Sequence, residues 1–452
     1  MAQITDLKRA FDALNGKQAV YTTLFNYAEG RQPVRYATDR LQEAFRDLNT
    51  HFTQNWCSVI INAALDRLTL KGWDAKDKTT NDKLDELWTV ENLQLDAYEA
   101  HYGALVTGEA FIIAWDSGDG VEIYYNDPRM CHVFYNAERP KEKQFAAKWW
   151  SDGNVWYMTL YYPDRLEYYV TKSKDQPGGY GAFKPMETPT ADNPFGVIPV
   201  FHLRTNRRKA RGELDDIITL QDAVNKLLAD MMVAGEFGAF PQRYIISQAD
   251  TSNLKNGPHI IWEIPAGDGQ SESTQVGQFA ATDLNNYLNA MDKLANSIAI
   301  ISRTPKHYFY NAGASLSGEA LIAMEAPLTK KIGQRQENFS VVWRELGAFL
   351  VKLTGGGDVE PADITPIWEP AESVQPYTEA QTRVLAVNAG IPLNTQLRRE
   401  GWGTDEIEAM EKDAADEKKK NAALAPVLLD EARARGDNSN DNPLGNGNEE
   451  PA

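Results

Sequence analysis

Six histidines and two cysteines are the side chains best suited to act as nucleophiles, proton carriers or metal ligands in this sequence. No two histidines form an HExxH or HxxxH pair, the spacing that puts two imidazoles on one helix face to bind zinc. The cysteines form no CxxC pair. We therefore expect structural or exposed histidines, buried reduced thiols, no disulfide, no metal and no cofactor. These residues are His51, His101, His132, His202, His259, His307, Cys57 and Cys131.

Sequence motifs for nucleotide and acyl chemistry are also absent. There is no GxxxxGK followed by Ser or Thr, so an ATP-hydrolysing motor is not predicted. No GxGxxG opens a helix after a strand, as a dinucleotide site would require. Residues 313–317 (Gly-Ala-Ser-Leu-Ser) miss the GxSxG nucleophile elbow at its last position. The sequence favours a protein that is not an enzyme, with a nuclease site built from separated carboxylates as the alternative.

Two groups of basic residues could contact a negatively charged partner. The first is the only dense basic cluster, which indicates a solvated surface, a protein contact or a contact with nucleic acid. The second lies in a loop without hydrophobic periodicity, where positive groups and small residues could touch phosphates briefly. That loop could equally be a plain connection between two helices. The cluster is Arg204, Arg207, Arg208, Lys209 and Arg211, and the loop contributes Arg303, Lys306, His307, Gly313 and Ser315.

The composition is that of a folded, acidic protein. Its 452 residues suffice for two or three domains with sizeable cores. The net charge of −18 argues against ordinary DNA binding, which needs a basic face. It is compatible with a surface past which DNA slides, because an acidic wall repels phosphates. No apolar run approaches the roughly 18 residues that span a bilayer, and the N-terminus lacks an apolar signal core, so we expect a soluble intracellular product without membrane contact.

Hydrophobic spacing predicts a first half in which helices precede strands. Helices are expected over residues 1–30, over 52–70 with a stop at Lys71-Gly72, and over 84–106 with a short break. A strand is expected at 109–115, and turn residues divide the region after it into short runs rich in Trp and Tyr. These runs are 121–125, 131–135, 145–150, 156–161 and 165–170, followed by an extended segment at 193–202.

Two long helices, each with one apolar face, enclose a small insert. The first begins at Gly212 with an acidic turn that suits the helix dipole, and the second begins near Thr282, a residue type that caps helices. Between them, the insert contains two strand-like runs, 243–246 and 260–264. The pattern predicts a helical hairpin with a head, and an ordinary helical subdomain would show the same spacing.

A third long helix is expected over residues 317–353, with a kink at Pro327 because proline removes a backbone donor. Residues 358–376 are Pro-rich and predicted to be extended. Residues 376–429 return to helix, with breaks at two Gly-containing turns. The tail from Arg435 onward is rich in Asn, Asp, Gly and Glu and is expected to be disordered.

Several of these segments resemble the portal proteins of tailed bacteriophages. The most telling is Ser317-Gly-Glu-Ala-Leu321, which follows Ser302-Arg-Thr-Pro305. Each motif is weak alone, and their joint order over about residues 20–420 is specific. The early tyrosine–glycine motif departs from the family, because Asn26 or Ala28 stands where a second tyrosine is common. The other matching segments are 26–30, 55–68, 105–111, 195–200 and 220–225.

The resemblance implies an α+β portal fold that assembles as a ring, usually of twelve subunits. It divides the chain into an α/β wing, a two-helix stem, a small α/β clip, a tunnel loop, a long kinked helix and a helical crown. The clip would bind the packaging motor and connector proteins through Arg243, Tyr244, Trp262 and Ile264. The implied bounds are wing 1–211, stem helices 212–239 and 281–302, clip 240–280, tunnel loop 303–316, kinked helix with return to the wing 317–375, crown 376–432 and disordered tail 433–452.

By the same resemblance, the ring replaces a pentamer at one capsid vertex, nucleates head assembly, and conducts double-stranded DNA without sequence specificity. Its expected partners are other copies of the chain, the terminase large subunit, a head–tail adaptor, and the major capsid and scaffolding proteins. The residues Arg303, Lys306, His307, Gly313 and Ser315 would face the DNA channel. The expected location is the portal vertex of the virion, after assembly in the host cytoplasm. The alternatives are a DNA-acting enzyme such as a nuclease, or a minor capsid or adaptor protein.

Overall fold

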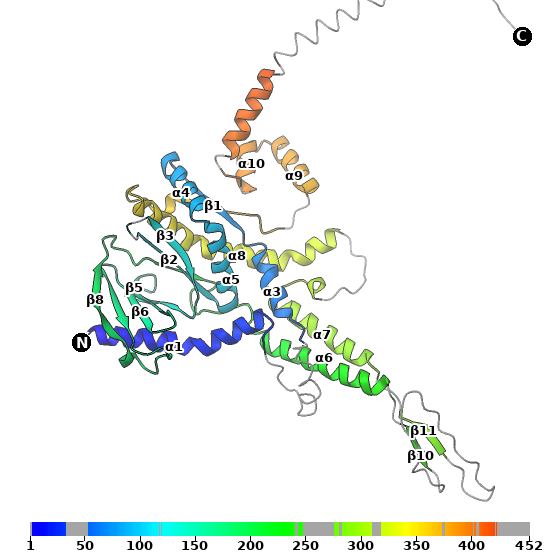
Figure 1. Cartoon of the computed structure of the whole chain (residues 1–452). Coiled ribbons are helices and arrows are strands. Elements are labelled where there is room, and N and C mark those ends of the chain that lie inside the picture. The colour runs from blue at the N-terminus through cyan, green and yellow to red at the C-terminus, as the bar shows by residue number, and fades with distance from the viewer. Residues whose placement is uncertain are drawn as a thin grey trace, which may run out of the picture. The chain divides into compact units, whose positions relative to one another are not determined.

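Helices and antiparallel sheets are mixed along the chain, which confirms the predicted combination of both element types (Figure 1). Two compact units are present, Met1–Ser373 and Val374–Ala452, and each is described by itself. The computed structural model describes residues 2–32, 53–116, 118, 120–239, 243–246, 275–279, 283–309, 318–372, 376–400, 402–403, 406–420 and 422.

The first unit begins with helices and continues with strands, as the hydrophobic spacing predicts. Within the described residues, its helices are α1 (Ala2–Ala28), α3 (Trp56–Leu65), α4 (Lys78–Val90), α5 (Leu93–Thr107), α6 (Ile218–Ala239), α7 (Asn285–Ser302) and α8 (Gly318–Leu353). Its strands are β1 (Leu70–Ala75), β2 (Glu109–Asp116), β3 (Val121–Asn126), β4 (Cys131–Tyr135), β5 (Lys143–Ser151), β6 (Trp156–Tyr161), β7 (Arg165–Val170), β8 (Lys184–Asp192), β9 (Val200–Arg204), β10 (Arg243–Ile246), β11 (Gln275–Gln278) and β12 (Ile364–Trp368).

Two antiparallel sheets pack against each other in the strand-rich part. One has the strand order β4-β5-β6-β7-β8, and the other has the order β3-β2-β9. Successive side chains of β2 point to opposite faces, as in any strand. Phe111 and Ile113 join the apolar cluster between the sheets, whereas Ile112 joins the main core on the other face. The three-stranded sheet is therefore covered on both faces.

Helix α1 connects the five-stranded sheet with the main core. Its first half packs Phe11 against Trp149 in an edge-to-face arrangement, with ring centroids 5.9 Å apart. Its last turns bury Tyr27, whose hydroxyl donates to Asp222 of α6 at 2.6 Å. A helix of 27 residues is long enough to reach both places.

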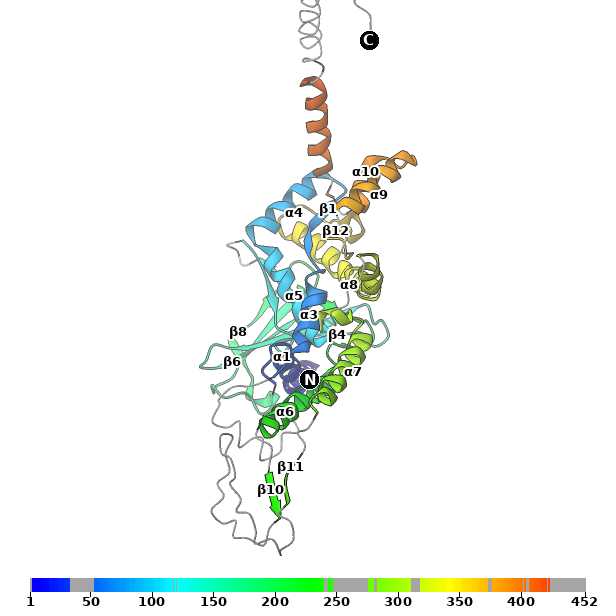
Figure 2. The ribbon, with the colours of Figure 1, turned by 90° about the vertical axis from the view of Figure 1, so that its right-hand side faces the viewer.

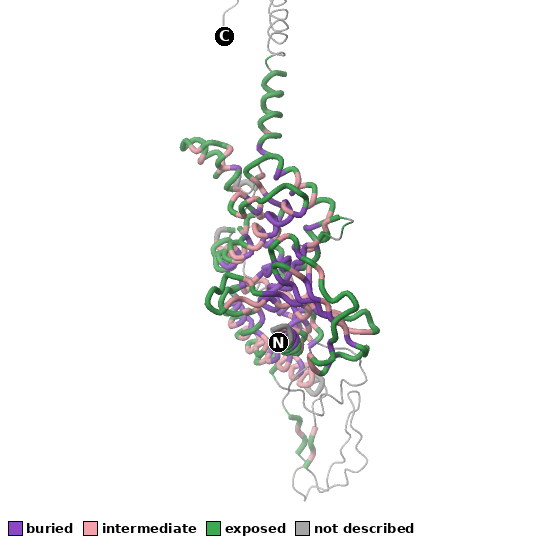
Figure 3. Tube along the Cα trace, turned by 90° about the vertical axis from the view of Figure 1, so that its left-hand side faces the viewer, coloured by how far each residue is buried: buried purple, intermediate pink, exposed green. Residues whose placement is uncertain are grey.

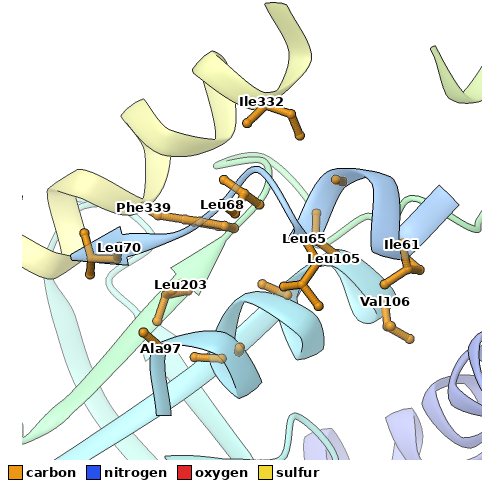
Figure 4. Packing of buried hydrophobic residues seen from close by; sticks show 14 of the residues in the cluster. Ile61, Leu65, Leu68, Leu70, Ala97, Leu105, Val106, Leu203, Ile332 and Phe339 are labelled. Carbon is orange, nitrogen blue, oxygen red and sulfur yellow. The ribbon is translucent and has the colours of Figure 1, made fainter. Parts of the chain in front are cut away.

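The main core lies where α3, α5, α8 and β1 meet. Figure 4 shows Leu65 of α3, Leu105 of α5, and Ile332 and Phe339 of α8 among its buried side chains. In the same cluster, Trp73 of β1 donates its indole N–H to the carbonyl of Trp343 at 3.0 Å. The buried residues concentrate in these helices and sheets (Figure 3), so this core sets the position of α8.

Two glycines let the chain cross itself where α5 turns into β2. Gly108 has a φ of +91°, and a Cβ there would lie 2.1 Å from the backbone nitrogen of Arg211. A Cβ on Gly212 would lie 2.0 Å from the carbonyl oxygen of Val106. Such approaches are possible only without a side chain. The segment 105–111, one of the matching sequence motifs, is thus the place where the start of the α6 region passes over α5.

Helices α6 and α7 lie side by side, and β10 and β11 form a two-stranded hairpin that stands between them in the sequence (Figures 1 and 2). Val224 of α6 and Ile298 of α7 are buried in the main core. The strand predicted at 243–246 is confirmed, and the one predicted at 260–264 lies outside the described residues. The predicted helical pair with a strand-bearing insert is therefore present.

The described residues of the second unit form short helices. They are α9 (Pro376–Asn388), α10 (Leu393–Arg399) and a further helix at 406–420. Helices α9 and α10 contact each other, and Arg383 donates to the carboxylate of Glu400 at 3.0 Å. Gly390, with a φ of +93°, separates the first two helices, so the predicted break at this position is confirmed.

The predicted helix over 52–70 is too long at its C-terminal end. Helix α3 ends at Leu65, and Lys71-Gly72 lies in strand β1 instead of stopping a helix. The reason is tertiary, because β1 pairs with β12, which comes almost 300 residues later in the chain. Apolar residues at 68 and 70 fit either element by their spacing.

Two further differences concern the strand-rich part and its exit. The helix predicted from Gly212 begins at Ile218, because the residues before it cross over α5 and Glu213 donates its N–H to the carbonyl of Leu105. The sequence pattern does not predict strand β8. Nearly all of its side chains are exposed, so it shows no alternation of apolar and polar residues.

Candidate functional site

The segment after α7 turns sharply and is then held against the rest of the unit. Arg303 ends α7 in the left-handed conformation, with a φ of +56°, and is exposed. Thr304 is almost fully buried, and its N–H bonds to the last turn of α7. Phe309 packs edge-to-face on Trp56 of α3, with ring centroids 5.8 Å apart. Residues 303–309, the described part of the predicted loop, therefore form a fixed base.

Lys306 and His307 both contact carboxylates of their own chain. The Lys306 Nζ lies 2.8 Å from a carboxylate oxygen of Asp292 in α7. The His307 Nε2 lies 3.9 Å from Glu325 in α8, and its Nδ1 is buried without a hydrogen-bond partner in the described part of the chain. Their predicted contact with DNA stays a prediction. Two other predicted loop residues, Gly313 and Ser315, lie outside the described residues.

Glu325, in the first turns of α8, contacts residues at the base of the loop. One of its carboxylate oxygens lies 3.1 Å from Arg67, and the other accepts a hydrogen bond of 3.2 Å from the Tyr308 hydroxyl. Arg67 also donates to that hydroxyl at 2.9 Å. Because the Arg67 and Glu325 side chains are mostly buried, the pair connects the α3–β1 turn with α8. Sequence spacing carries no signal for a contact between positions so far apart.

A buried ion cluster joins α6, α7 and α8. Glu213, just before α6, lies 3.0 Å from Lys331 and 2.8 Å from Arg335, both on α8. Lys331 also donates to the carbonyl of Ser302 at the end of α7, at 2.8 Å. Burial alone would raise the pKa of Glu213, but the two cations lower it below its usual value, so the carboxylate stays charged. The cluster fixes the three helices relative to one another.

A second buried cluster fixes α1 to the sheets. Glu109 of β2 lies 3.1 Å from Lys17, accepts a hydrogen bond of 2.8 Å from the Tyr21 hydroxyl, and lies 3.0 Å from the His202 Nε2. Burial would raise the pKa of Glu109, but the positive charge of Lys17 and the hydrogen bond from His202 lower it. These groups satisfy one another inside the fold, which indicates a structural role.

The residues best suited to chemistry are mostly buried. Burial lowers the pKa of both His101 and His132 to about 3, so both imidazoles are neutral. The expected burial of Cys57 and Cys131 is confirmed, and it raises the pKa of each thiol to about 12. Among the residues that the structure describes, no group of three or more His, Cys, Asp or Glu could hold a metal ion. His51 and His259 lie outside those residues.

The hairpin between α6 and α7 displays apolar side chains. Arg243 and Tyr244, two predicted partner contacts, lie on β10. The Tyr244 ring lies over Gly277 of β11, where a Cβ would meet it at 2.4 Å. A two-stranded sheet leaves strand edges for pairing, and exposed aromatic residues favour an interface. The predicted contacts Trp262 and Ile264 lie outside the described residues. The exposed apolar side chains are Tyr244, Ile246, Val276 and Phe279.

A family model and two relatives to which this chain is similar all describe portal proteins of phages. The family described as "Phage portal protein, SPP1 Gp6-like" matches residues 2–420. The portal proteins of Mycobacterium phages L5 and D29 are each 22% identical to this chain, over 405 and 409 residues. The alignments cover 82% of this chain in both cases, and 80% and 81% of the two relatives.

The chain is also similar to two solved structures of gene transfer agent particles. One comes from the virion of the native particle, with a TM-score of 0.43, and one from the neck of the empty particle, with a TM-score of 0.45. Each is 12% identical to this chain. The alignments cover 82% of this chain and 89% of each matched chain. In the described part of this chain, no helix combines the length and the apolar character needed to cross a membrane.

Proposed function

The chain belongs to the SPP1 Gp6-like family of phage portal proteins, and from this we propose that copies of it form a ring-shaped channel through which phage DNA enters and leaves the capsid. A portal role follows from the family and from the two portal proteins to which the chain is similar. The family is structural rather than enzymatic. The observation that carries the proposal is a family match that runs over nearly the whole chain, residues 2–420.

We assign the parts of the ring subunit as follows. Helices α6 and α7 are the two stem helices, and the hairpin between them belongs to the clip. The support for this is that two adjacent helices enclose a strand-bearing insert. The wing is residues 1–211 and the crown is 376–432. We propose twelve copies in the ring.

The loop between α7 and α8 is proposed to face the channel as a tunnel loop. Its base at residues 303–309 is held by Asp292, Glu325 and Trp56. A fixed base would transmit force from a passing DNA duplex to α8 without displacing the loop's ends. Arg303, Lys306 and His307 supply positive charge near this base, and the small residues 313 and 315 would let the loop follow the DNA surface.

The hairpin is proposed to bind the packaging motor and the head–tail adaptor. Its support is the exposed aromatic pair Tyr244 and Phe279, whose ring centroids lie 5.3 Å apart. Ile246 is exposed on the same face of the sheet as Tyr244, and exposed apolar groups of this kind mark protein contacts. The terminase large subunit would bind during packaging and the adaptor afterwards. Other proposed partners are the major capsid and scaffolding proteins, at the portal vertex of the virion, with assembly in the host cytoplasm.

The size and shape of the purified protein test the ring. We expect light scattering to give a mass of many copies of the 50.6 kDa chain, and electron micrographs to show rings with a central hole. A particle that remains a monomer over a wide range of protein and salt concentrations would contradict the proposal.

A further inference from the structure

The dense basic cluster forms an exposed turn next to α6. We call residues 206–209 (Asn-Arg-Arg-Lys) the basic turn. Arg207, Arg208 and Lys209 are all exposed. Within the described part of the chain, the side chains of Arg207 and Arg208 form no hydrogen bond or salt bridge. The function proposed above makes no use of these charges.

The basic turn is held rigidly at both ends. The buried Thr205 hydroxyl lies 2.8 Å from the carbonyl oxygen of Arg211, which closes the turn. The carbonyl of Thr205 accepts hydrogen bonds from Arg335 at 2.7 Å and from Asn338 at 3.0 Å. Inside the turn, the Arg208 N–H donates to the Asn206 side chain at 2.9 Å. Little backbone entropy would be lost when a partner binds to a turn that is already ordered.

A groove of about 630 Å³ lies beside the basic turn, between α1 and the start of α6. Its apolar wall includes Leu24, Ile218 and Val20, and the last of these is 58% exposed. Lys209 and Arg211 also line it, and Arg211 pairs with Asp216. A mostly exposed valine beside a fixed basic turn is the composition of a protein contact.

The lining favours a protein over a nucleic acid. Its apolar side chains Val20, Leu24 and Ile218 suit an apolar side chain and offer nothing to a phosphate. Asp215 and Asp216, which also line the groove, are paired with Arg211. An acidic protein surface could place carboxylates on the exposed arginines and an apolar side chain against Val20. A second copy of this chain has that character, because its net charge is −18 and its only dense basic cluster lies here.

We propose that the basic turn and the groove beside it receive an acidic surface of a neighbouring copy of this chain. Acidic copies packed side by side repel one another unless opposite charges meet. A contact between two different surfaces of identical chains closes into a ring when the rotation fits. This inference rests on the proposed ring and names the surface at which its subunits recognise each other.

A photo-crosslinking experiment tests the contact. Lys209→Cys gives an accessible thiol, which is labelled with a benzophenone maleimide, because the native thiols Cys57 and Cys131 are buried. Lys184→Cys, on the exposed strand β8, is the control. We expect copy-to-copy crosslinks from position 209 in the assembled protein, at several times the yield from position 184. Assembly lost with Lys209→Cys and kept with Lys184→Cys would also support the contact.

The other outcomes separate this inference from the ring itself. Assembled particles in which position 209 gives no more copy-to-copy crosslinks than position 184 would overturn the contact and leave the ring standing. Crosslinks from position 209 to added duplex DNA alone would overturn it in the same way and indicate a nucleic-acid surface. A wild-type protein that does not assemble would overturn both.

Charge reversal gives an independent measurement. In the variant Arg207→Glu/Arg208→Glu, the protein concentration needed for assembly should rise about tenfold at low salt, because rim charges govern association. Arg207→Lys/Arg208→Lys keeps the charge and should change it little. An assembly threshold and salt dependence equal to those of the wild type in the reversed variant would contradict the contact.

Discussion

Positions 108 and 212 require glycine because the backbone of another segment passes close to each of them. We predict that Gly108→Ala or Gly212→Ala lowers the free energy of unfolding by more than about 3 kcal/mol, because a Cβ would meet backbone atoms near 2 Å. The urea midpoint measures this loss. Gly16→Ala is the control, since a Cβ in that exposed turn of α1 meets nothing within 4 Å. The control should gain up to about 1 kcal/mol.

His101 should make the fold sensitive to acid. Burial lowers its pKa from 6.5 to about 3 in the folded chain. Between these values the unfolded chain binds a proton that the folded chain does not, so stability present above pH 6.5 is lost as the pH falls toward 3. The slope of interest is the change in the free energy of unfolding per pH unit. We predict that His101→Gln reduces this slope by up to about 1.4 kcal/mol per pH unit. Unfolding by urea at several pH values between 7 and 4 measures the slope, and equal slopes in both proteins would contradict the prediction.

At the scale of elements, the loop base and the hairpin are the two parts with a direct functional test. The double variant Lys306→Ala/His307→Ala removes the contacts with Asp292 and Glu325. We expect rings and heads to form, because these contacts are partly exposed and contribute on the order of 1 kcal/mol or less. DNA packaging or retention should fall, as measured by the fraction of DNA-filled heads.

The control for the loop is Lys293→Ala, which removes an exposed lysine of α7 and should leave packaging unchanged. Tethering the loop with engineered cysteines gives a second test of the same element. Heads that fill and retain DNA normally with the loop tethered would show that residues 303–316 only connect α7 with α8.

The hairpin should be dispensable for folding but necessary for packaging. Replacing residues 242–264 by a glycine-rich linker leaves the apolar residues of α6 and α7 that enter the main core, such as Val224 and Ile298. We expect heads to assemble and to stay empty, because the variant lacks Tyr244 and Ile246 of the surface proposed to bind the motor. DNA content per head is the measurement, and normal packaging would refute the assignment of this surface.

For the whole molecule, charge is the property that we expect to decide how the proposed ring meets DNA. The chain carries −18, and a conduit must not hold phosphates tightly. We predict that purified rings bind duplex DNA weakly at physiological salt, with a shallow dependence on salt concentration. Electrophoretic mobility shifts over a salt series test this. Tight binding with a steep salt dependence would instead indicate a dedicated DNA-binding surface.

Much of this protein follows from sequence patterns that are local. The five strands β3 to β7, the pair α6 and α7, and α8 each have a hydrophobic period or a run of aromatic and β-branched residues within the element itself. The acidic charge and the absence of nucleotide motifs are likewise readable residue by residue. The joint order of several weak motifs indicates the portal family, because motif order along a chain is kept when single residues change.

Tertiary structure alone decided the features that depend on distant residues. Strand β1 exists because β12 pairs with it, and Gly212 precedes α6 because the chain must first cross α5 at Gly108. Glu213 forms ion pairs with Lys331 and Arg335, and these pairs hold the helices in position. The tertiary structure also places Lys306 and His307 at a fixed base and the basic turn beside a groove. Periodicity reports which face of an element is buried, but only the folded chain determines what that face meets, because the contacts join positions with no relation in spacing.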